Sequence, residues 1–150
     1  MSIRSTTVRL AAALALAAGA ATAAHADDQA ALAAAAKEPG AVVSPSGLVF
    51  KSIKEGKGRS PKSFDKVKAN YVGKFTNGTK FDASADHGGP LEFPLDGVIA
   101  CWTEGMQKLK VGGKAKLTCP SAIAYGPNGL GPIPGGATLV FEVELVGISN

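Results

Sequence analysis

The sequence predicts an α+β domain in which an antiparallel sheet packs against one short helix. Residues 66–75, 114–119 and 139–145 alternate apolar and polar side chains, which is typical of strands with one buried and one wet face. Between the first two of these segments, apolar residues recur at helical spacing over residues 99–109. A chain of 150 residues with 45% hydrophobic content has room for one modest core of this kind.

The first 26 residues predict a signal peptide. Two arginines precede an uncharged apolar run over residues 10–24, and Ala24-His25-Ala26 places small residues at both recognition positions of a signal peptidase. A transmembrane anchor is the alternative, but the run is dominated by alanine, and about 20 strongly apolar residues are needed to cross a bilayer. We therefore expect cleavage before Asp27, no membrane anchor, and a periplasmic or secreted protein.

After cleavage the chain begins with an alanine-rich leader over residues 27–45, which is either a short helix or a frayed tail. Alanine favours helix, acidic residues stand in the expected first turn, and Pro39-Gly40 ends the pattern. Loss of two arginines from the 16 basic residues leaves 14 against 12 acidic ones, a net charge of +2. Because the lysines are dispersed rather than clustered, the sequence predicts no nucleic-acid partner.

The strand predicted at residues 66–75 is followed by a turn signal. Asn77-Gly78 accepts positive φ at both central positions of a tight turn, so the chain is expected to return along residues 79–82 as a hairpin. Asn77-Gly78-Thr79 also fits a glycosylation sequon, which is the alternative interpretation. The side chains predicted to face the core are Val67, Ala69, Tyr71, Gly73 and Phe75.

The helix predicted within residues 99–109 presents one apolar stripe and ends before Gly112-Gly113. The two later strands are expected to bury one face each in the same antiparallel sheet. The stripe consists of Ile99, Trp102, Met106 and Leu109, and the inward strand residues are Ala115, Leu117, Cys119, Leu139, Phe141, Val143 and Leu145.

The sequence lacks the usual motifs of covalent or metal-assisted catalysis. It contains no G-x-S-x-G nucleophile elbow, and no Gly-Lys is followed by Ser or Thr as a phosphate-binding loop requires. His87 is the only histidine that remains after signal cleavage, so a Cys/His metal site or a Ser/His relay has too few parts. We interpret His87 as a loop residue and expect any activity to depend on binding and environment, without a metal or cofactor.

Four separated segments closely resemble FKBP-type peptidyl-prolyl cis-trans isomerases and occur in the family's order over roughly residues 46–148. They are VKANYVGKF, KFDAS, VIACWTEGMQKLKVGGKAKLTCPSAIAYG and IPGGATLVFEVELVGI. The resemblance implies an isomerase domain over residues 46–150, with a half-open antiparallel sheet wrapped around one short helix. It also implies proline-containing unfolded or nascent exported polypeptides as substrates and macrolides as candidate ligands. Related longer proteins carry a much larger dimerisation region before this domain, so a monomer is expected here.

Isomerisation of an X-Pro bond needs no nucleophile, because it breaks no σ bond. The barrier is roughly 18 to 20 kcal/mol and arises from amide resonance. A dry pocket disfavours the charge-separated planar amide relative to the twisted one, and a donor that prefers the twisted amide adds differential binding. A ten-thousandfold acceleration requires only about 5.5 kcal/mol from such terms.

The resemblance places a pocket over Trp102, which forms the floor beneath the substrate proline. In the family's pattern, the backbone N–H of Ile99 donates to one substrate carbonyl and the Tyr125 hydroxyl donates to another. From alternation alone, the aromatic strand residues of this set would be ordinary core residues. The resemblance assigns catalytic roles to Tyr71, Phe81, Asp82, Ile99, Trp102, Tyr125 and Phe141, and substrate contacts to Leu91, Val98 and Ile133.

Two features of the predicted pocket have alternative interpretations, and two residues depart from the family's pattern. Asp82 either caps the turn after its strand or forms a polarising pocket wall. Residues 126–136, rich in glycine and proline, form either a mobile flap or a plain surface loop. Leu91 stands where many family members have an aromatic wall, and Cys101 replaces the usual small residue before Trp102. We expect these departures to alter ligand preference rather than abolish activity.

Cys101 and Cys119 are the only two cysteines, an even number in an exported chain, so a disulfide between them is expected. It would tie the start of the helix to the inward face of a strand and contribute about 3 kcal/mol in the chain-entropy model. Two buried thiols or a redox-active pair are the alternatives, and the second is disfavoured because the spacing is not Cys-x-x-Cys.

The competing function is a noncatalytic peptide-binding module or holdase chaperone that uses the same pocket. The absence of a large dimerisation region and of a long insertion before Val98 disfavours it. The sequence therefore predicts a prolyl isomerase that accelerates slow X-Pro steps in the folding of exported proteins.

Overall fold

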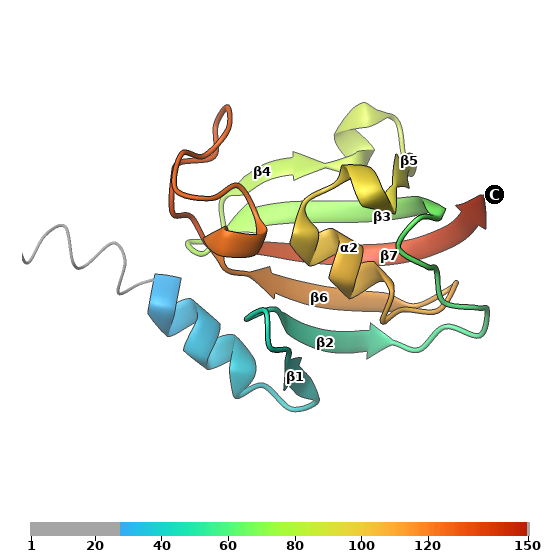
Figure 1. The fold of residues 1–150 in the computed structure, drawn as a ribbon, viewed down its shortest axis with the longest axis horizontal. Helices are drawn as coiled ribbons and strands as arrows, with labels where there is room; N and C mark the ends of the chain where they lie inside the picture. Colours follow the sequence, from blue (N-terminus) through green and yellow to red (C-terminus); the bar gives the residue numbers. More distant parts are fainter. Residues whose placement is uncertain (1–27, 150) are drawn as a thin grey trace, which may run out of the picture.

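The computed structural model describes residues 28–149, and the predicted signal peptide and its cleavage site lie outside the described residues (Figure 1). The predicted α+β class is confirmed: an antiparallel sheet carries α2 across one face. The strands are β1 (Ala41–Val43), β2 (Val49–Lys54), β3 (Lys66–Phe75), β4 (Lys80–Ala83), β5 (Leu91–Pro94), β6 (Lys114–Cys119) and β7 (Leu139–Ser149). The helices are one over residues 28–36, α2 (Ala100–Met106) and three short 3-10 turns, η1 (Ser84–His87), η2 (Leu95–Gly97) and η3 (Ser121–Ile123).

The strand order is β1-β2-β6-β7-β3-β4, and β5 also pairs with β3. All neighbouring pairs are antiparallel. β7 pairs with β3 along the full length of that strand, from Lys66 opposite Ser149 to Phe75 opposite Leu139. β4 and β5 occupy the two halves of the other edge of β3, so the segment that joins them arches beside the face that α2 covers (Figure 1).

The strands predicted at residues 66–75 and 114–119 are confirmed with the same bounds, and the one predicted at 139–145 extends to Ser149. The helix is shorter than the apolar stripe that predicted it. Ile99 is the residue before α2, and Leu109 follows the helix but is still buried. The stripe therefore continues beyond the helix and packs as an irregular turn.

The predicted hairpin forms, but its turn differs from the expected one. Among the described residues only glycines have positive φ, so Asn77 does not adopt it and Gly78 does, at 89°. The N–H of Gly78 donates to the Phe75 carbonyl, and the Asn77 side chain accepts from the Thr79 N–H at 2.9 Å. The asparagine stabilises the reversal through this side-chain bond, and the glycine supplies the left-handed residue of a longer hairpin loop.

The core lies between α2 and the sheet. Gly105 allows the helix to approach the sheet closely, because a Cβ there would lie 2.7 Å from a methyl group of Leu117. The largest fully buried side chains are Leu48, Leu95, Met106, Leu117, Leu139, Leu145, Val67 and Val143, together with Thr118 and the two cysteines.

Of the two alternatives for the leader, the helical one holds for residues 28–36. Ala35 is buried, and just beyond the helix Glu38 pairs with Lys116 of β6 at 2.8 Å. At the start of the described chain, Asp28 accepts a hydrogen bond from Thr76 at 3.0 Å. The helix is thus attached to the domain near both of its ends. None of the helices in residues 28–149 combines the length and apolar character that crossing a bilayer requires.

Candidate active site

A cavity of about 340 Å³ opens between β3, β4, β5 and the start of α2. Eight of the ten side chains predicted from the sequence are among the residues that line it, which makes it the predicted pocket. The lining residues come from several segments that are separate in the sequence, so the fold is needed to bring them together. They are Tyr71, Phe81, Asp82, Phe93, Gly97, Val98, Ile99, Trp102, Tyr125 and Phe141.

Trp102 lies at the centre of an aromatic cluster that lines this cavity. Its ring is 5% exposed and meets Tyr71, Phe93 and Phe141 edge to face, at centroid distances of 5.1, 5.3 and 5.6 Å. Such T-shaped pairs contribute about 0.5–1.5 kcal/mol each beyond their buried area. Nε1 of Trp102 is buried and has no hydrogen-bond partner within residues 28–149. The cluster therefore presents a rigid and dry surface.

Gly73 makes room for two of the aromatic walls. It lies on the same face of β3 as Tyr71 and is directly opposite Phe141 of β7 in the strand register. A Cβ at this position would lie 2.7 Å from Phe81 and 2.9 Å from Phe141. The rings of Phe81 and Phe141 meet edge to face at 5.7 Å in the space that the glycine leaves.

Asp82 is the carboxylate of the cavity, and three donors hold it. The Tyr71 hydroxyl donates to Oδ2 at 2.7 Å, the Ala83 N–H donates to Oδ1 at 2.9 Å, and Nε2 of His87 lies 2.9 Å from Oδ1. Partial burial opposes its ionisation, but the hydrogen bonds from Tyr71 and His87 outweigh this and hold the pKa of Asp82 below its ordinary value. Asp82 therefore both braces the chain after β4 and lines the cavity as a carboxylate, so the two sequence interpretations are compatible.

The two tyrosines of the cavity stay protonated at neutral pH. Burial, followed by the hydrogen bond to Asp82, raises the pKa of Tyr71 far above its ordinary value. Burial, followed by the charge of Asp82, also raises the pKa of Tyr125. Both hydroxyls are therefore neutral donors, and Tyr71 uses its proton to hold the carboxylate.

Ile99 occupies the N-cap position of α2 in an extended conformation. Its carbonyl accepts from the N–H groups of Trp102 and Thr103 at 3.0 and 3.2 Å, which fixes the peptide plane at the cavity rim. Within the described residues its own N–H has no acceptor. A backbone donor beside the aromatic cluster is the geometry that the sequence interpretation requires for a substrate carbonyl.

Leu91 and Ile133 are not among the lining residues, and two residues that do line the cavity were missed. Leu91 pairs with Ala69 at the far end of β5, and Phe93, two residues on, supplies the aromatic wall expected near Leu91. Positions 91 and 93 share one face of the strand, but its four residues are too few for this periodicity to stand out in the sequence. Ile133 is buried within residues 126–136, where it exchanges backbone hydrogen bonds with Leu130. Gly97 was the second residue missed.

His87 is more than the plain loop residue that the sequence suggested. It ends η1 and contacts the Asp82 carboxylate from outside the cavity. The sequence pattern does not predict the contact between His87 and Asp82, because it depends on how η1 turns back toward β4.

The predicted disulfide between Cys101 and Cys119 is confirmed, and neither cysteine is free. Both residues are fully buried, with their Cα atoms 5.9 Å apart. The bond joins the residue directly before Trp102 to the end of β6, from which the chain continues through η3 to Tyr125. It therefore ties together the two segments that carry the cavity residues Trp102 and Tyr125.

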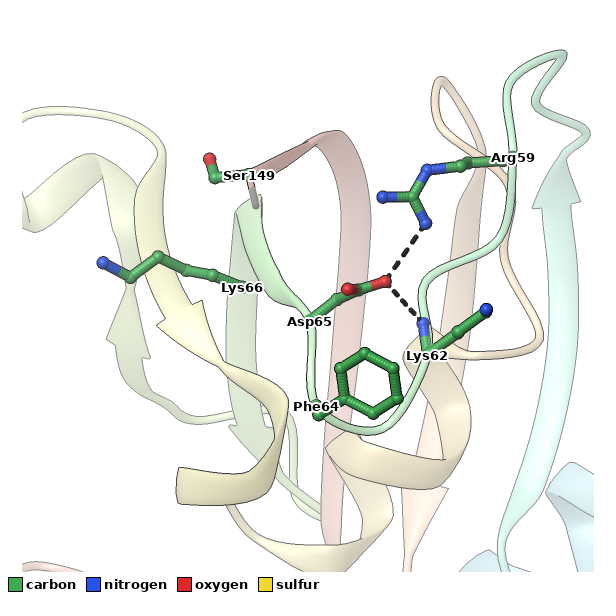
Figure 2. A pocket seen from close by; sticks show the side chains of 6 residues that line it. All are labelled: Arg59, Lys62, Phe64, Asp65, Lys66 and Ser149. Atoms are coloured by element: carbon green, nitrogen blue, oxygen red, sulfur yellow. Dashed lines mark hydrogen bonds and ion pairs between the residues drawn. The ribbon is translucent and has the colours of Figure 1, made fainter.

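A larger cavity of about 590 Å³ lies at the start of β3 and lacks this aromatic enclosure (Figure 2). Figure 2 shows Asp65 accepting from Arg59 and from the Lys62 N–H, at 3.1 and 2.9 Å. The Lys62 N–H first, and then the Arg59 guanidinium, hold the pKa of Asp65 below its ordinary value against the cost of burial. Phe64 beside it is 71% exposed. These contacts brace the loop before β3.

Residues 28–149 contain no cluster of His, Cys, Asp and Glu suited to a metal ion.

Comparisons with known proteins show what this chain is similar to. Residues 57–146 match the sequence profile of the FKBP-type peptidyl-prolyl cis-trans isomerase domain. The isomerase FkpA of Aeromonas hydrophila is 51% identical over 79% of this chain and 44% of its own length, and FkpA of Escherichia coli K12 is 49% identical over 75% and 42%. This chain therefore spans less than half the length of these curated relatives.

Solved structures of peptidyl-prolyl cis-trans isomerases are also similar to this chain. The crystal structure of FkpA from Escherichia coli is similar with a TM-score of 0.81 and 39% identity, over 99% of this chain and 74% of that one. A peptidyl-prolyl cis-trans isomerase from Pseudomonas syringae is similar with a TM-score of 0.79 and 34% identity, over 86% and 96% of the two chains.

Proposed function

Since the chain belongs to the family of FKBP-type peptidyl-prolyl cis-trans isomerases, we propose that it isomerises X-Pro bonds of exported polypeptides in the cavity over Trp102. The observation that carries the proposal is the enclosure of this cavity by edge-to-face aromatic rings around a single carboxylate. The predicted signal peptide supports a periplasmic location, and the expected form is a monomer that needs no cofactor.

The proline ring packs on the dry face of Trp102, and the peptide is held by donors at the rim. The Ile99 N–H binds the substrate carbonyl beyond the proline, and the Tyr125 hydroxyl binds a second carbonyl. Removal of water disfavours the planar amide, whose charge separation water would otherwise stabilise. Val98 contributes apolar area at the rim, whereas contacts from Leu91 and Ile133 require movement of the substrate or the flap.

Asp82 contributes in two ways: it holds the Tyr71 side chain in place, and its negative charge acts on the substrate. Its carboxylate fixes the Tyr71 hydroxyl, and hence the ring that packs against Trp102. Its negative charge acts on the substrate amide in a site of low polarity, where such a charge has more influence than in water. No covalent intermediate is involved.

The test compares two variants that each lose an aromatic ring. Trp102→Leu removes the proposed floor, and Phe64→Leu removes an exposed ring outside the cavity. In an assay of short Xaa-Pro peptides by the chain without residues 1–26, Trp102→Leu should lower kcat/KM at least tenfold, about 1.4 kcal/mol of transition-state stabilisation. Phe64→Leu should retain wild-type activity.

A macrolide ligand of this family provides the second arm of the test. Catalysis that the ligand abolishes supports isomerisation in this cavity. Binding of proline peptides or of the macrolide without any turnover would refute the proposed activity and favour the alternative of a peptide-binding module or holdase. Equal loss of activity in both variants would show that the cavity over Trp102 is not the site.

A further inference from the structure

The net charge of the cavity depends on one pair of residues. Among the side chains that line it, Asp82 is the acidic one, and none is basic. The raised pKa values of Tyr71 and Tyr125, which follow from burial, keep both phenols neutral. His87 lies outside the lining but within 2.9 Å of the Asp82 carboxylate, so its protonation state decides whether that charge is balanced.

The other charged groups near His87 form a separate pair. Asp86, next to it in η1, makes an ion pair with Lys80 of β4 at 3.1 Å, and both side chains are about half exposed. Tyr71 faces Asp82 from β3 through its hydrogen bond, and Tyr125 faces it from the segment after η3. Among these neighbours His87 is the one that contacts the Asp82 carboxylate and can carry a positive charge.

We propose that His87 is a specificity-determining residue, whose protonation switches the cavity from a net charge of −1 to neutral and thereby changes which side chains it accepts beside the substrate proline. The inference rests on the proposed isomerase activity. Histidines in proteins commonly change charge between pH 5 and 8, whereas Asp82, with three hydrogen-bond donors, remains ionised over that range. His87 is half exposed, so protons reach it without opening the fold.

His87 can lose its positive charge and still keep its contact with Asp82. A neutral imidazole with its proton on Nε2 still donates to Oδ1 of Asp82, so deprotonation removes the positive charge but can keep the contact. The carboxylate also keeps the donors from Tyr71 and Ala83 in both states. The expected effect of pH is therefore a change in electrostatic preference, with the aromatic walls in place.

The size of the effect follows from Coulomb's law. A substrate charge about 8 Å from Asp82, in a solvent-exposed position, changes binding roughly twofold when the carboxylate charge is balanced. Lysine and glutamate beside the proline respond in opposite directions, so the ratio of their kcat/KM values changes about fivefold. Low salt preserves the effect, because 0.1 M salt screens charges over about 10 Å.

The experiment measures kcat/KM for Lys-Pro, Glu-Pro and Ala-Pro peptides at pH 5.5 and pH 8 in low salt. For the wild type, the ratio of kcat/KM for Lys-Pro to that for Glu-Pro should be about fivefold higher at pH 8 than at pH 5.5. His87→Gln, which keeps a donor but is never charged, should show the high ratio at both pH values. His87→Arg, which is always charged, should show the low ratio at both.

A wild-type ratio that does not change with pH would overturn the inference, and so would an unchanged pH response in His87→Gln. Turnover of the Ala-Pro peptide distinguishes failure of this inference from failure of the proposed function. If the wild type does not turn over Ala-Pro, the proposed isomerase activity is refuted, and the inference about His87 is still open to test. In that case the same ratios are obtained from peptide affinities, measured through the fluorescence of Trp102, the only tryptophan of the chain. Urea unfolding of each variant checks that the fold is retained.

Discussion

Replacement of Gly73 by alanine tests whether the aromatic walls are fixed in place. Gly73 lies in the middle of β3, and its φ is not in the left-handed region, so the backbone itself accepts a side chain. The added Cβ would lie 2.7 Å from Cζ of Phe81 and 2.9 Å from Cε1 of Phe141, closer than carbon atoms pack. Since both rings are held by other rings, neither can move without disturbing the cluster.

Overpacking of this kind costs about 1–3 kcal/mol of unfolding free energy. It should also displace Phe81 and Phe141 by a fraction of an ångström or more, and misplacement of about 1 Å in an active site can lower turnover on the order of a hundredfold. Urea unfolding measures the first effect and the Xaa-Pro peptide assay measures the second. We expect a loss in kcat/KM between about tenfold and a hundredfold.

Gly147→Ala is the matched control. Gly147 lies in β7 opposite Lys68, and a Cβ there would meet no atom within 4 Å. Alanine in this strand should stabilise the protein by about 0.5–1 kcal/mol and leave activity unchanged. If Gly73→Ala unfolds like the wild type and retains its kcat/KM, the argument that these rings are immobile is wrong. A loss of stability with full activity would remove Phe81 and Phe141 from the proposed site.

Three further predictions concern the disulfide and the carboxylates. Replacing both Cys101 and Cys119 by alanine should lower the free energy of unfolding by about 3 kcal/mol, since the bond closes a loop with a sequence separation of 18; an unchanged urea midpoint would contradict this. Tyr71→Phe removes a donor to Asp82, so the pKa of that carboxyl should rise toward its ordinary value in an NMR titration, with a loss of about 1 kcal/mol in stability. The contacts described above lower the pKa values of Asp65 and Asp82 in the folded state, so their stabilisation is complete above about pH 5 and is lost as the pH falls through the lowered values. Urea midpoints at pH 7, 5 and 3 check the sign, and equal midpoints at pH 7 and pH 3 would show that these contacts do not contribute.

The long strands could be predicted from the sequence because each has one buried and one wet face. β3 alternates regularly, and β6 does so from Lys114 to Leu117, although its Thr118 is buried as well. The same periodicity placed Tyr71 and Phe141 on the inner face. β1 and β5 have three and four residues, too few for a period of two to stand out. β2 carries its apolar residues in a short and irregular run, so pairing with β6 rather than its own pattern defines it.

The sequence predicted those features of the site that depend on the type of side chain. It missed those that depend on how short turns and strands place a residue. The paired cysteines and the aromatic residues could be chosen from the sequence, because a disulfide and a cavity wall need particular side chains. Phe93 was missed because β5 itself was not expected. The contact between His87 and Asp82 is produced by the single turn of η1, which no hydrophobic period describes.

The central position of β7 has a consequence for how the chain folds. This strand is the last in the described chain, yet it lies between β6 and β3 and pairs with both. Until it arrives, β2 and β6 have no connection to the hairpin of β3 and β4, and Phe141 is missing from the aromatic cluster. Folding must therefore wait for contacts that are distant in sequence, which are slow to form. A protein proposed to help others fold after export would itself be inactive until its final strand had crossed the membrane.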